Sequence, residues 1–168
     1  MTNVPNAAER TILCVPTFGD AIENLDSSFR SLLNCAPITF ATRPRKLPTS
    51  VVYLFSDKDE PIYVGRSNRF RQRLGNHCLN GSQSNQASLA FRLACEDVQH
   101  VREKYRRGSS GADALQNVPG LADAFSRMKA RLRSMEIRYV EEPDQVRQAL
   151  LEMYVALSLG TQQDFGTH

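Results

Sequence analysis

Cysteine is scarce in this chain and follows no recognisable motif. Its four copies, Cys14, Cys35, Cys78 and Cys95, are scattered, and no two of them form a CxxC pair. Structural zinc sites need closely spaced pairs of Cys or His, and small disulfide-rich domains need a denser cysteine framework. The sequence therefore indicates neither kind of site, and it predicts free thiols in a reducing compartment.

Long apolar runs are also missing. No stretch approaches the roughly 20 apolar residues of a membrane span, and the first residues lack the charged-then-apolar pattern of a secretory signal. We therefore expect no membrane span and a cytoplasmic location. The 168 residues are 41% hydrophobic and 23% charged, which is typical of a globular domain with a core and room for an appended arm.

Charge is unevenly distributed along the chain. The net charge of +3 permits nucleic-acid binding without requiring it. The basic residues form three clusters: Arg66, Arg69, Arg71 and Arg73; Arg102, Lys104, Arg106 and Arg107; and Arg127, Lys129, Arg131 and Arg133. Acidic residues gather instead at 57–60 and 141–144. This segregation favours a polyanionic partner on one side, although for any single cluster a solvated helix face is the simpler explanation.

Residues 51–64 predict a β-hairpin. Two apolar runs, VVYLF and PIYVG, flank the charged turn SDKDE. If the hairpin is centred near Lys58, Tyr53 and Tyr63 lie directly opposite each other on one face of the sheet. Packing of the two rings, worth roughly 0.2–1 kcal/mol, is the simplest explanation for this pair.

The residues after the hairpin suggest more than packing. Gly65 ends the second strand, and Ser67 or Asn68 is placed to cap a helix that begins at once. A glycine beside a helix N-terminus lets a phosphate approach free backbone N–H groups. On that helix Arg73 and His77 are spaced i, i+4 and share a face. We therefore expect two phenols, a guanidinium and an imidazole to converge beside an anion site.

Hydrophobic periodicity places further elements around the hairpin. The pattern predicts a short strand at 11–16, helices at 20–33, 68–77, 86–107, 121–132 and from Pro143 onward, and a strand at 135–140. The buried stripe expected on the last helix consists of Val146, Ala149, Leu150, Met153 and Leu157. This order predicts an α+β fold in which helices flank a small three-stranded antiparallel sheet.

The motif set resembles the GIY-YIG nuclease superfamily. The first motif is Val51-Val52-Tyr53 and the second is Tyr63-Val64-Gly65. Arg73 follows eight residues after Gly65, and His77 four residues later. Val51 stands where the family usually has glycine, a departure that affects the start of a strand more than the chemistry.

The resemblance also implies a division of the chain. Residues 49–168 would form the GIY-YIG-like nuclease domain. Residues 1–48 would form an N-terminal helical arm and a basic linker containing Arg43, Arg45 and Lys46. The basic residues of the linker can reach a nucleic-acid backbone, but a solvated linker is the simpler interpretation.

Glu152 is the single acidic residue between Ala149 and Leu159. Without the family it reads as part of a polar helix face. The resemblance implies that it holds a divalent metal, Mg²⁺ or Mn²⁺, because Mg²⁺ accepts one hard oxygen ligand completed mostly by water. Where the family often has an asparagine, the tail offers Gln163 or Asp164, or nothing serves.

The resemblance implies an endonuclease that hydrolyses DNA phosphodiester bonds. Tyr53 would help to remove a proton from the attacking water, Arg73 would stabilise the transition state, and Tyr63 and His77 would position the water or relay protons. Glu152 would complete the catalytic set.

Residues around the second motif would contact the nucleic acid: Gly65, Arg66, Ser67 and Arg69. Two alternatives stay open from the residues themselves. One is a catalytically inactive nucleic-acid-binding module of the same fold, and the other is a protein-interaction domain with solvated arginine clusters.

Overall fold

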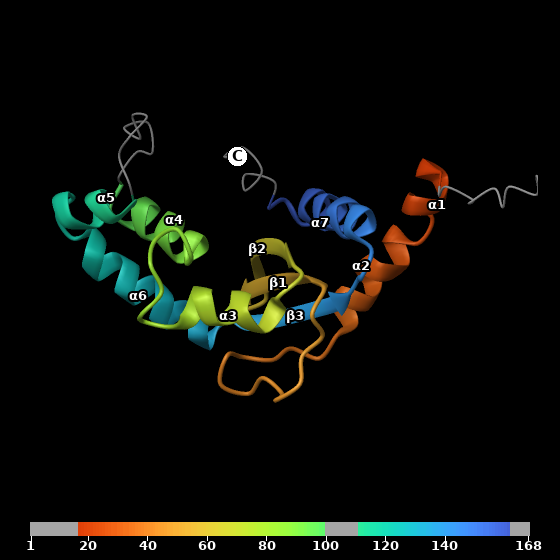
Figure 1. The fold of residues 1–168 in the computed structure, drawn as a ribbon, viewed down its shortest axis with the longest axis horizontal. Coiled ribbons are helices and arrows are strands. Elements are labelled where there is room, and N and C mark those ends of the chain that lie inside the picture. Colours follow the sequence, from red (N-terminus) through yellow and green to blue (C-terminus); the bar gives the residue numbers. More distant parts are fainter. Residues whose placement is uncertain (1–16, 100–110, 162–168) are drawn as a thin grey trace, which may run out of the picture.

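The computed structural model describes residues 17–99 and 111–161 (Figure 1). The helices are α1 (Phe18–Ile22), α2 (Leu25–Asn34), α3 (Phe70–Cys78), α4 (Ser88–Asp97), α5 (Gly111–Asn117), α6 (Leu121–Ser134) and α7 (Gln145–Leu159). The strands are β1 (Val51–Asp57), β2 (Glu60–Ser67) and β3 (Glu136–Glu141). The predicted α+β class, a three-stranded antiparallel sheet flanked by helices, is confirmed.

Strand β1 lies at the centre of the sheet, in the order β2-β1-β3. Tyr53 and Phe55 face a core formed with α3, α4 and α6, whereas Val52 and Leu54 face a second core formed with α2 and α7. Figure 1 shows α7 on one side of the sheet and α3 on the other. This alternation makes the sheet a partition between two layers of helices.

The hairpin register differs from the prediction. Lys58 and Asp59 both have positive φ, 51° and 67°, as in a two-residue type I′ turn. Tyr53 pairs with Gly65 rather than with Tyr63. The expected direct pairing of the two tyrosines is therefore wrong by two residues. Because two residues are one full period of a strand, both rings still lie on the same face.

A β-bulge contributes half of that shift. Ser56 pairs with Pro61, but Phe55 pairs with Tyr63, so Ile62 is an extra residue in β2. Proline has no N–H to donate to a ladder and is found at bulges and on edge strands. Pro61 occupies both situations, since β2 is an edge of the sheet.

The first predicted helix, 20–33, is two helices. The Thr17 Oγ1 accepts a hydrogen bond from the Asp20 N–H at 3.2 Å, and the Asp20 carboxylate accepts one from the Thr17 N–H at 2.7 Å. Asp20 is therefore the reciprocal partner in a capping box and not the cap itself. On α2, Leu25 and Leu32 are buried in the core shared with β1 and α7. The predicted boundary between an N-terminal arm and the rest of the chain stays a prediction.

Four helices, rather than the predicted three, lie between β2 and β3 in the described part of the chain. The extra helix is α5, which lies between the helices predicted at 86–107 and 121–132, where the sequence pattern predicted no helix. Helix α4 ends at Asp97, short of the predicted 107, and residues 100–107 of the predicted helix lie outside the described residues. So do the second basic cluster and the strand predicted at 11–16.

Three of the five residues in the predicted buried stripe of α7 face outward, whereas Ala149 and Leu150 are half-buried and Leu150 packs against the second core. Val146, Met153 and Leu157 are 63%, 52% and 63% exposed. The side chains that α7 buries are Gln148, Leu151, Val155 and Ala156. The helix is apolar on most of its circumference, so periodicity alone did not distinguish the two faces.

Gln148 explains which face of α7 points inward. Its amide nitrogen donates to the carbonyls of Val51, Ser67 and Glu142, each at 3.3 Å. A buried polar group needs such partners, so these bonds fix α7 against the ends of β1 and β2. Within residues 17–99 and 111–161, no helix is both long and apolar enough to cross a membrane.

Candidate active site

Tyr53 is wholly buried at the centre of an aromatic cluster on the α3 side of the sheet. Its ring lies 5.4 Å from the ring of Phe70 and 6.1 Å from the ring of Tyr63, measured between centroids. Gly65 lies opposite Tyr53 on β2, and a Cβ there would come within 2.7 Å of both the Tyr53 hydroxyl and a ring carbon of Tyr63. Glycine is therefore required at this position because the two phenols cover it. Phosphate contact at Gly65 stays a prediction.

Helix α3 directs two further side chains at the Tyr53 oxygen. The Arg73 Nε donates to it at 3.3 Å, and the His77 Nε2 lies 3.2 Å from it. The expected shared face of Arg73 and His77 is thus observed, and both residues meet at one phenol. The guanidinium also donates to the Ser88 hydroxyl at 3.2 Å and to the Gln86 carbonyl at 3.4 Å. Sequence reasoning missed Ser88 and Gln86, because only the tertiary fold brings the start of α4 beside α3.

Burial controls the protonation of this cluster. Burial, together with the neighbouring Tyr63, raises the pKa of Tyr53 above its usual value, although Arg73 opposes the change. Burial and then the charge of Arg73 lower the pKa of His77 to about 3. A tyrosine that acts as a base needs a lowered pKa, and in the free protein the pKa of Tyr53 is raised instead. At neutral pH Tyr53 is a phenol and His77 a neutral imidazole.

Tyr63 is the more accessible of the two phenols. It is half-buried, its ring lies 6.1 Å from that of His77, and the Arg92 guanidinium lies 5.7 Å from its ring centre. This contact suits a cation–π interaction. Tyr63 therefore joins the same cluster from the edge strand of the sheet.

A shallow pocket opens at the start of α3. It has a volume of about 210 Å³ and is lined by Ser67, Arg69, Gln72, Arg73 and Asn76. The expected helix cap at Ser67 or Asn68 is wrong, since α3 begins at Phe70, and the Ser67 hydroxyl instead accepts from the Arg69 N–H at 3.0 Å. No side chain caps the first turn, although the Phe70 N–H donates to the Thr49 carbonyl, so the N–H groups that follow and two arginines favour an anion here.

Glu152 approaches from the other side of the sheet. It lies on α7 one turn after Gln148, and its carboxylate accepts from the Arg66 Nε at 2.9 Å. Arg66 precedes Ser67, which lines the pocket, so this ion pair lies at the end of β2. The structure thus brings four of the five predicted catalytic side chains together around Tyr53, and it places Glu152 on the opposite layer beside the end of β2.

Comparison with known families identifies the segment that carries this cluster. Residues 49–108 match the family model of the GIY-YIG catalytic domain. These residues are similar to the GIY-YIG catalytic domain. The predicted resemblance is therefore confirmed, and the domain implies nuclease-type activity in general terms. No curated protein and no solved structure matches the chain.

The GIY-YIG match includes β1, β2, α3 and α4, and therefore the whole Tyr53 cluster. It ends before β3 and α7, so Glu152 lies outside it. The assignment of Glu152 rests on its place in the fold, and that of the Tyr53 cluster rests on both the match and the geometry.

GIY-YIG nucleases generally depend on a divalent metal, which needs ligand atoms from the protein. Within the described residues, no three His, Cys, Asp or Glu side chains gather as a metal site. Gln163 and Asp164 lie outside the described residues. A single half-buried carboxylate, Glu152, fits Mg²⁺ completed by water and substrate oxygens, and it does not fit a fully protein-ligated metal.

Proposed function

We propose that this chain is a metal-dependent endonuclease that hydrolyses DNA phosphodiester bonds. The observation that carries the proposal is the Tyr53 oxygen, approached by both the Arg73 Nε and the His77 Nε2 within the GIY-YIG domain. Cross-strand packing alone does not account for a guanidinium and an imidazole directed at one buried phenol, because burying polar groups is costly.

His77 serves to position Tyr53. The His77 Nδ1 has no partner among the described residues, and a buried unpaired acceptor is tolerated better than a buried unpaired N–H. The proton therefore belongs on Nε2, which donates to the Tyr53 oxygen beside the Arg73 N–H. Two such donors favour the ionised phenol and so oppose the effect of burial on its pKa, and the ionised phenol is the form that takes a proton from water.

Arg73 links this cluster to the substrate. It lines the pocket at the start of α3, where its guanidinium is placed to stabilise the charge that develops on the phosphate. Glu152 would hold the divalent ion. When bound, that ion supplies Lewis-acid stabilisation of the phosphate and of the leaving oxygen.

Nicking of supercoiled plasmid DNA tests the proposal. Purified protein should nick with Mg²⁺ or Mn²⁺ and stop with a chelator, and Arg73→Ala or Glu152→Ala should each slow nicking by about 100-fold or more. Arg127→Ala is the matched control, because Arg127 pairs with Asp97 on the surface and should keep the wild-type rate. If the Arg73 and Glu152 variants nick as fast as wild type, this site is not responsible for the activity.

A catalytically inactive nucleic-acid-binding module is the second candidate. It is favoured by the complete burial of Tyr53 and by the raised pKa of its phenol. This alternative predicts salt-sensitive binding of DNA with no metal-dependent cleavage. A protein-interaction domain predicts no measurable affinity for DNA at moderate salt.

A further inference from the structure

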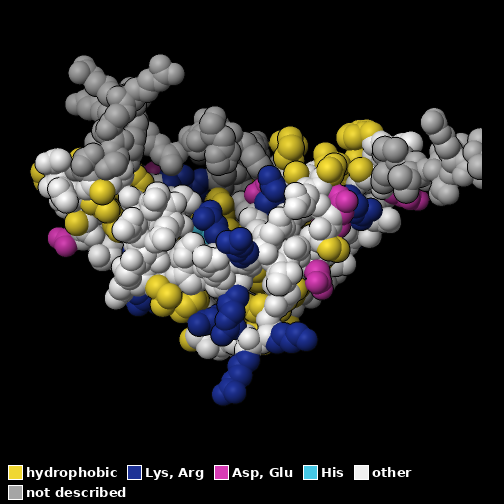
Figure 2. All heavy atoms as spheres, viewed as in Figure 1, with side chains coloured by type: hydrophobic (Ala, Val, Ile, Leu, Met, Phe, Trp, Pro, Cys, Tyr) yellow, Lys and Arg dark blue, Asp and Glu magenta, His cyan; other side chains and the backbone are white. Residues whose placement is uncertain are grey.

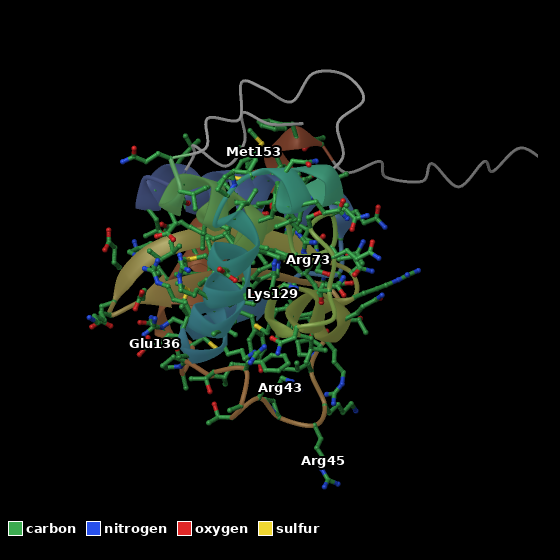
Figure 3. The ribbon with its side chains drawn as sticks, turned by 90° about the vertical axis from the view of Figure 1, so that its left-hand side faces the viewer. Arg43, Arg45, Arg73, Lys129, Glu136 and Met153 are labelled. Carbon is green, nitrogen blue, oxygen red and sulfur yellow. The ribbon has the colours of Figure 1, made fainter. Side chains whose placement is uncertain are left out.

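The loop of residues 39–48, which precedes the GIY-YIG match, carries Arg45 and Lys46 beside the first turn of α3. The Arg71 side chain donates to the Arg45 carbonyl at 2.6 Å and so ties the loop to the helix. Arg45, Lys46 and Arg69, the residue that immediately precedes α3, are all exposed. Figure 3 shows Arg45 projecting from the molecule, well beyond the position of Arg73.

This loop is held in place by contacts with the rest of the protein and within itself. Its entry is fixed by a two-way backbone bridge, in which Ile38 N donates to Ile137 O at 2.9 Å and Ile137 N donates to Ile38 O at 2.7 Å. Inside the loop the Arg43 guanidinium lies 3.7 Å from the centre of the Phe40 ring. Arg43 is therefore used internally, and the cations that the loop presents are Arg45 and Lys46.

The loop and α3 lie in two segments of the sequence that lack acidic residues. Residues 35–56 contain three Lys or Arg and residues 61–95 contain five, yet neither segment contains any Asp or Glu. In Figure 2, Lys and Arg side chains gather over α3 and over the loop below it. Such a one-sided positive field favours a polyanion.

Cations on another element are already engaged within the protein. On α6, Arg127 pairs with Asp97 and Arg131 with Asp57, both at 2.7 Å, and the buried Lys129 donates to backbone carbonyls. The third basic cluster is therefore structural. By contrast, the side chains of Arg45, Lys46 and Arg69 have no acidic or carbonyl partner among residues 17–99 and 111–161.

We propose that Arg45 and Lys46, continuous with Arg69 at the start of α3, bind phosphates of the DNA backbone that flank the bond to be cut. This inference rests on the proposed function, because the pocket beside Arg73 would receive the cleaved phosphate. Phosphates along a backbone repeat at regular intervals, so unpaired cations on two adjacent elements contact successive groups of one strand. An acidic protein lacks that regular spacing and is the less suitable partner.

Binding of an uncut DNA duplex tests the inference directly. Fluorescence anisotropy of a labelled duplex, with chelator present to prevent cleavage, should show Arg45→Ala/Lys46→Ala binding about tenfold or more weakly than wild type. The slope of log affinity against log salt should fall by about 2, because two phosphate contacts are lost. The matched control is Arg30→Ala/Lys58→Ala, which removes one arginine and one lysine from exposed positions on α2 and in the β1–β2 turn.

The outcomes separate this inference from the proposed function. If the loop variant binds DNA with the affinity and salt slope of wild type, the inference is wrong even if metal-dependent nicking is observed. If the loop variant weakens binding but no protein nicks DNA, the binding surface stands and the proposed hydrolysis fails. If wild type binds an RNA duplex tightly but the DNA duplex only weakly, the assignment to DNA is overturned. The same holds if wild type binds neither duplex.

Discussion

Single side chains decide the geometry around Tyr53, and Gly65 is the clearest case. The ring of Tyr53 lies over Gly65 because the residue opposite it on β2 has no side chain. The same gap admits the ring of Tyr63, so one glycine allows both phenols to share a face. The site therefore depends on the absence of a side chain at Gly65.

Gly65→Ala should distort the site. The new methyl group would lie 2.7 Å from the Tyr53 hydroxyl and from a Tyr63 ring carbon, and rings packed in a core cannot retreat freely. We expect a loss of about 1–3 kcal/mol in the free energy of unfolding and a larger relative loss of nicking activity. Urea denaturation and the plasmid assay measure the two effects.

The control for this change is Gly75→Ala on α3. Its methyl group would come no closer than 3.6 Å to Leu79, and alanine in a helix interior is favoured over glycine by up to about 1 kcal/mol. Stability should stay the same or rise. Equal damage from both substitutions would contradict the packing explanation for Gly65.

His77 should make stability depend on acid. Its pKa is about 3 in the folded protein and 6.5 in an unperturbed chain, so between these values the unfolded state binds one more proton. The stability that the neutral imidazole provides is present above pH 6.5 and is lost on acidification, by about 1.4 kcal/mol per pH unit inside this window.

The measurement for His77 is a difference between two proteins, because carboxylates titrate in the same range. The free energy of unfolding of wild type should fall more steeply from pH 6.5 to pH 4 than that of His77→Gln, which keeps an amide donor for Tyr53. Parallel curves for the two proteins would contradict a buried neutral imidazole.

The meeting of Arg73 and His77 on one face could be predicted, because i, i+4 spacing on a helix is a local property. The contacts from Arg73 to Ser88 and Gln86 could not, since they depend on how the chain returns after α3. The same limit applies to Glu152. Its sequence position marked it as a candidate, but its pairing with Arg66 follows from the packing of α7.

At the level of strands and helices, the hairpin shows that local sequence signals identify the strands but do not fix their register. Apolar runs and the charged turn identify β1 and β2, but a two-residue turn and a bulge moved the register by two residues. Two-residue type I′ turns usually contain a glycine, and neither Lys58 nor Asp59 provides that signal in the sequence. The strand face was predicted correctly because an even shift preserves the alternation.

Asp59→Gly should stabilise the hairpin. Asp59 has φ of 67°, a conformation that is strained for most residues and free for glycine, so we expect a gain of up to about 1 kcal/mol. Thermal unfolding monitored by circular dichroism would show a higher Tm. Glu60→Gly, one position later in β2, should lower the Tm instead, and a fall with both substitutions would argue against the turn described.

Helix α7 shows why a correct helix prediction can still misplace its buried face. Apolar residues cover most of its circumference, and the face that turns inward carries Gln148. A glutamine is not expected in a core from periodicity. It is buried because three carbonyls at the ends of the sheet and the β3–α7 connection need a donor, which is a tertiary requirement.

For the molecule as a whole, the sheet separates the aromatic cluster around Tyr53 from Glu152 on α7. The two sides approach each other at the end of β2. Arg66 points toward Glu152, while the neighbouring Ser67 lines the pocket beside Arg73. The Arg71 side chain, on the helix that lines that pocket, donates to the Arg45 carbonyl and so connects the pocket to the loop of residues 39–48. This arrangement suits one backbone passing over the start of α3, with its cleaved phosphate between the two layers.

The most direct measurement is the single-turnover rate of plasmid nicking, with saturating enzyme and Mg²⁺, for wild type against Tyr53→Phe. Phenylalanine keeps the ring packing around Gly65 and removes only the oxygen that Arg73 and His77 approach. We predict that Tyr53→Phe remains folded and bound to DNA and nicks about 100-fold more slowly or worse. A Tyr53→Phe protein that nicks at the wild-type rate would show that the phenol is a packing residue and that the hydrolysis takes place elsewhere.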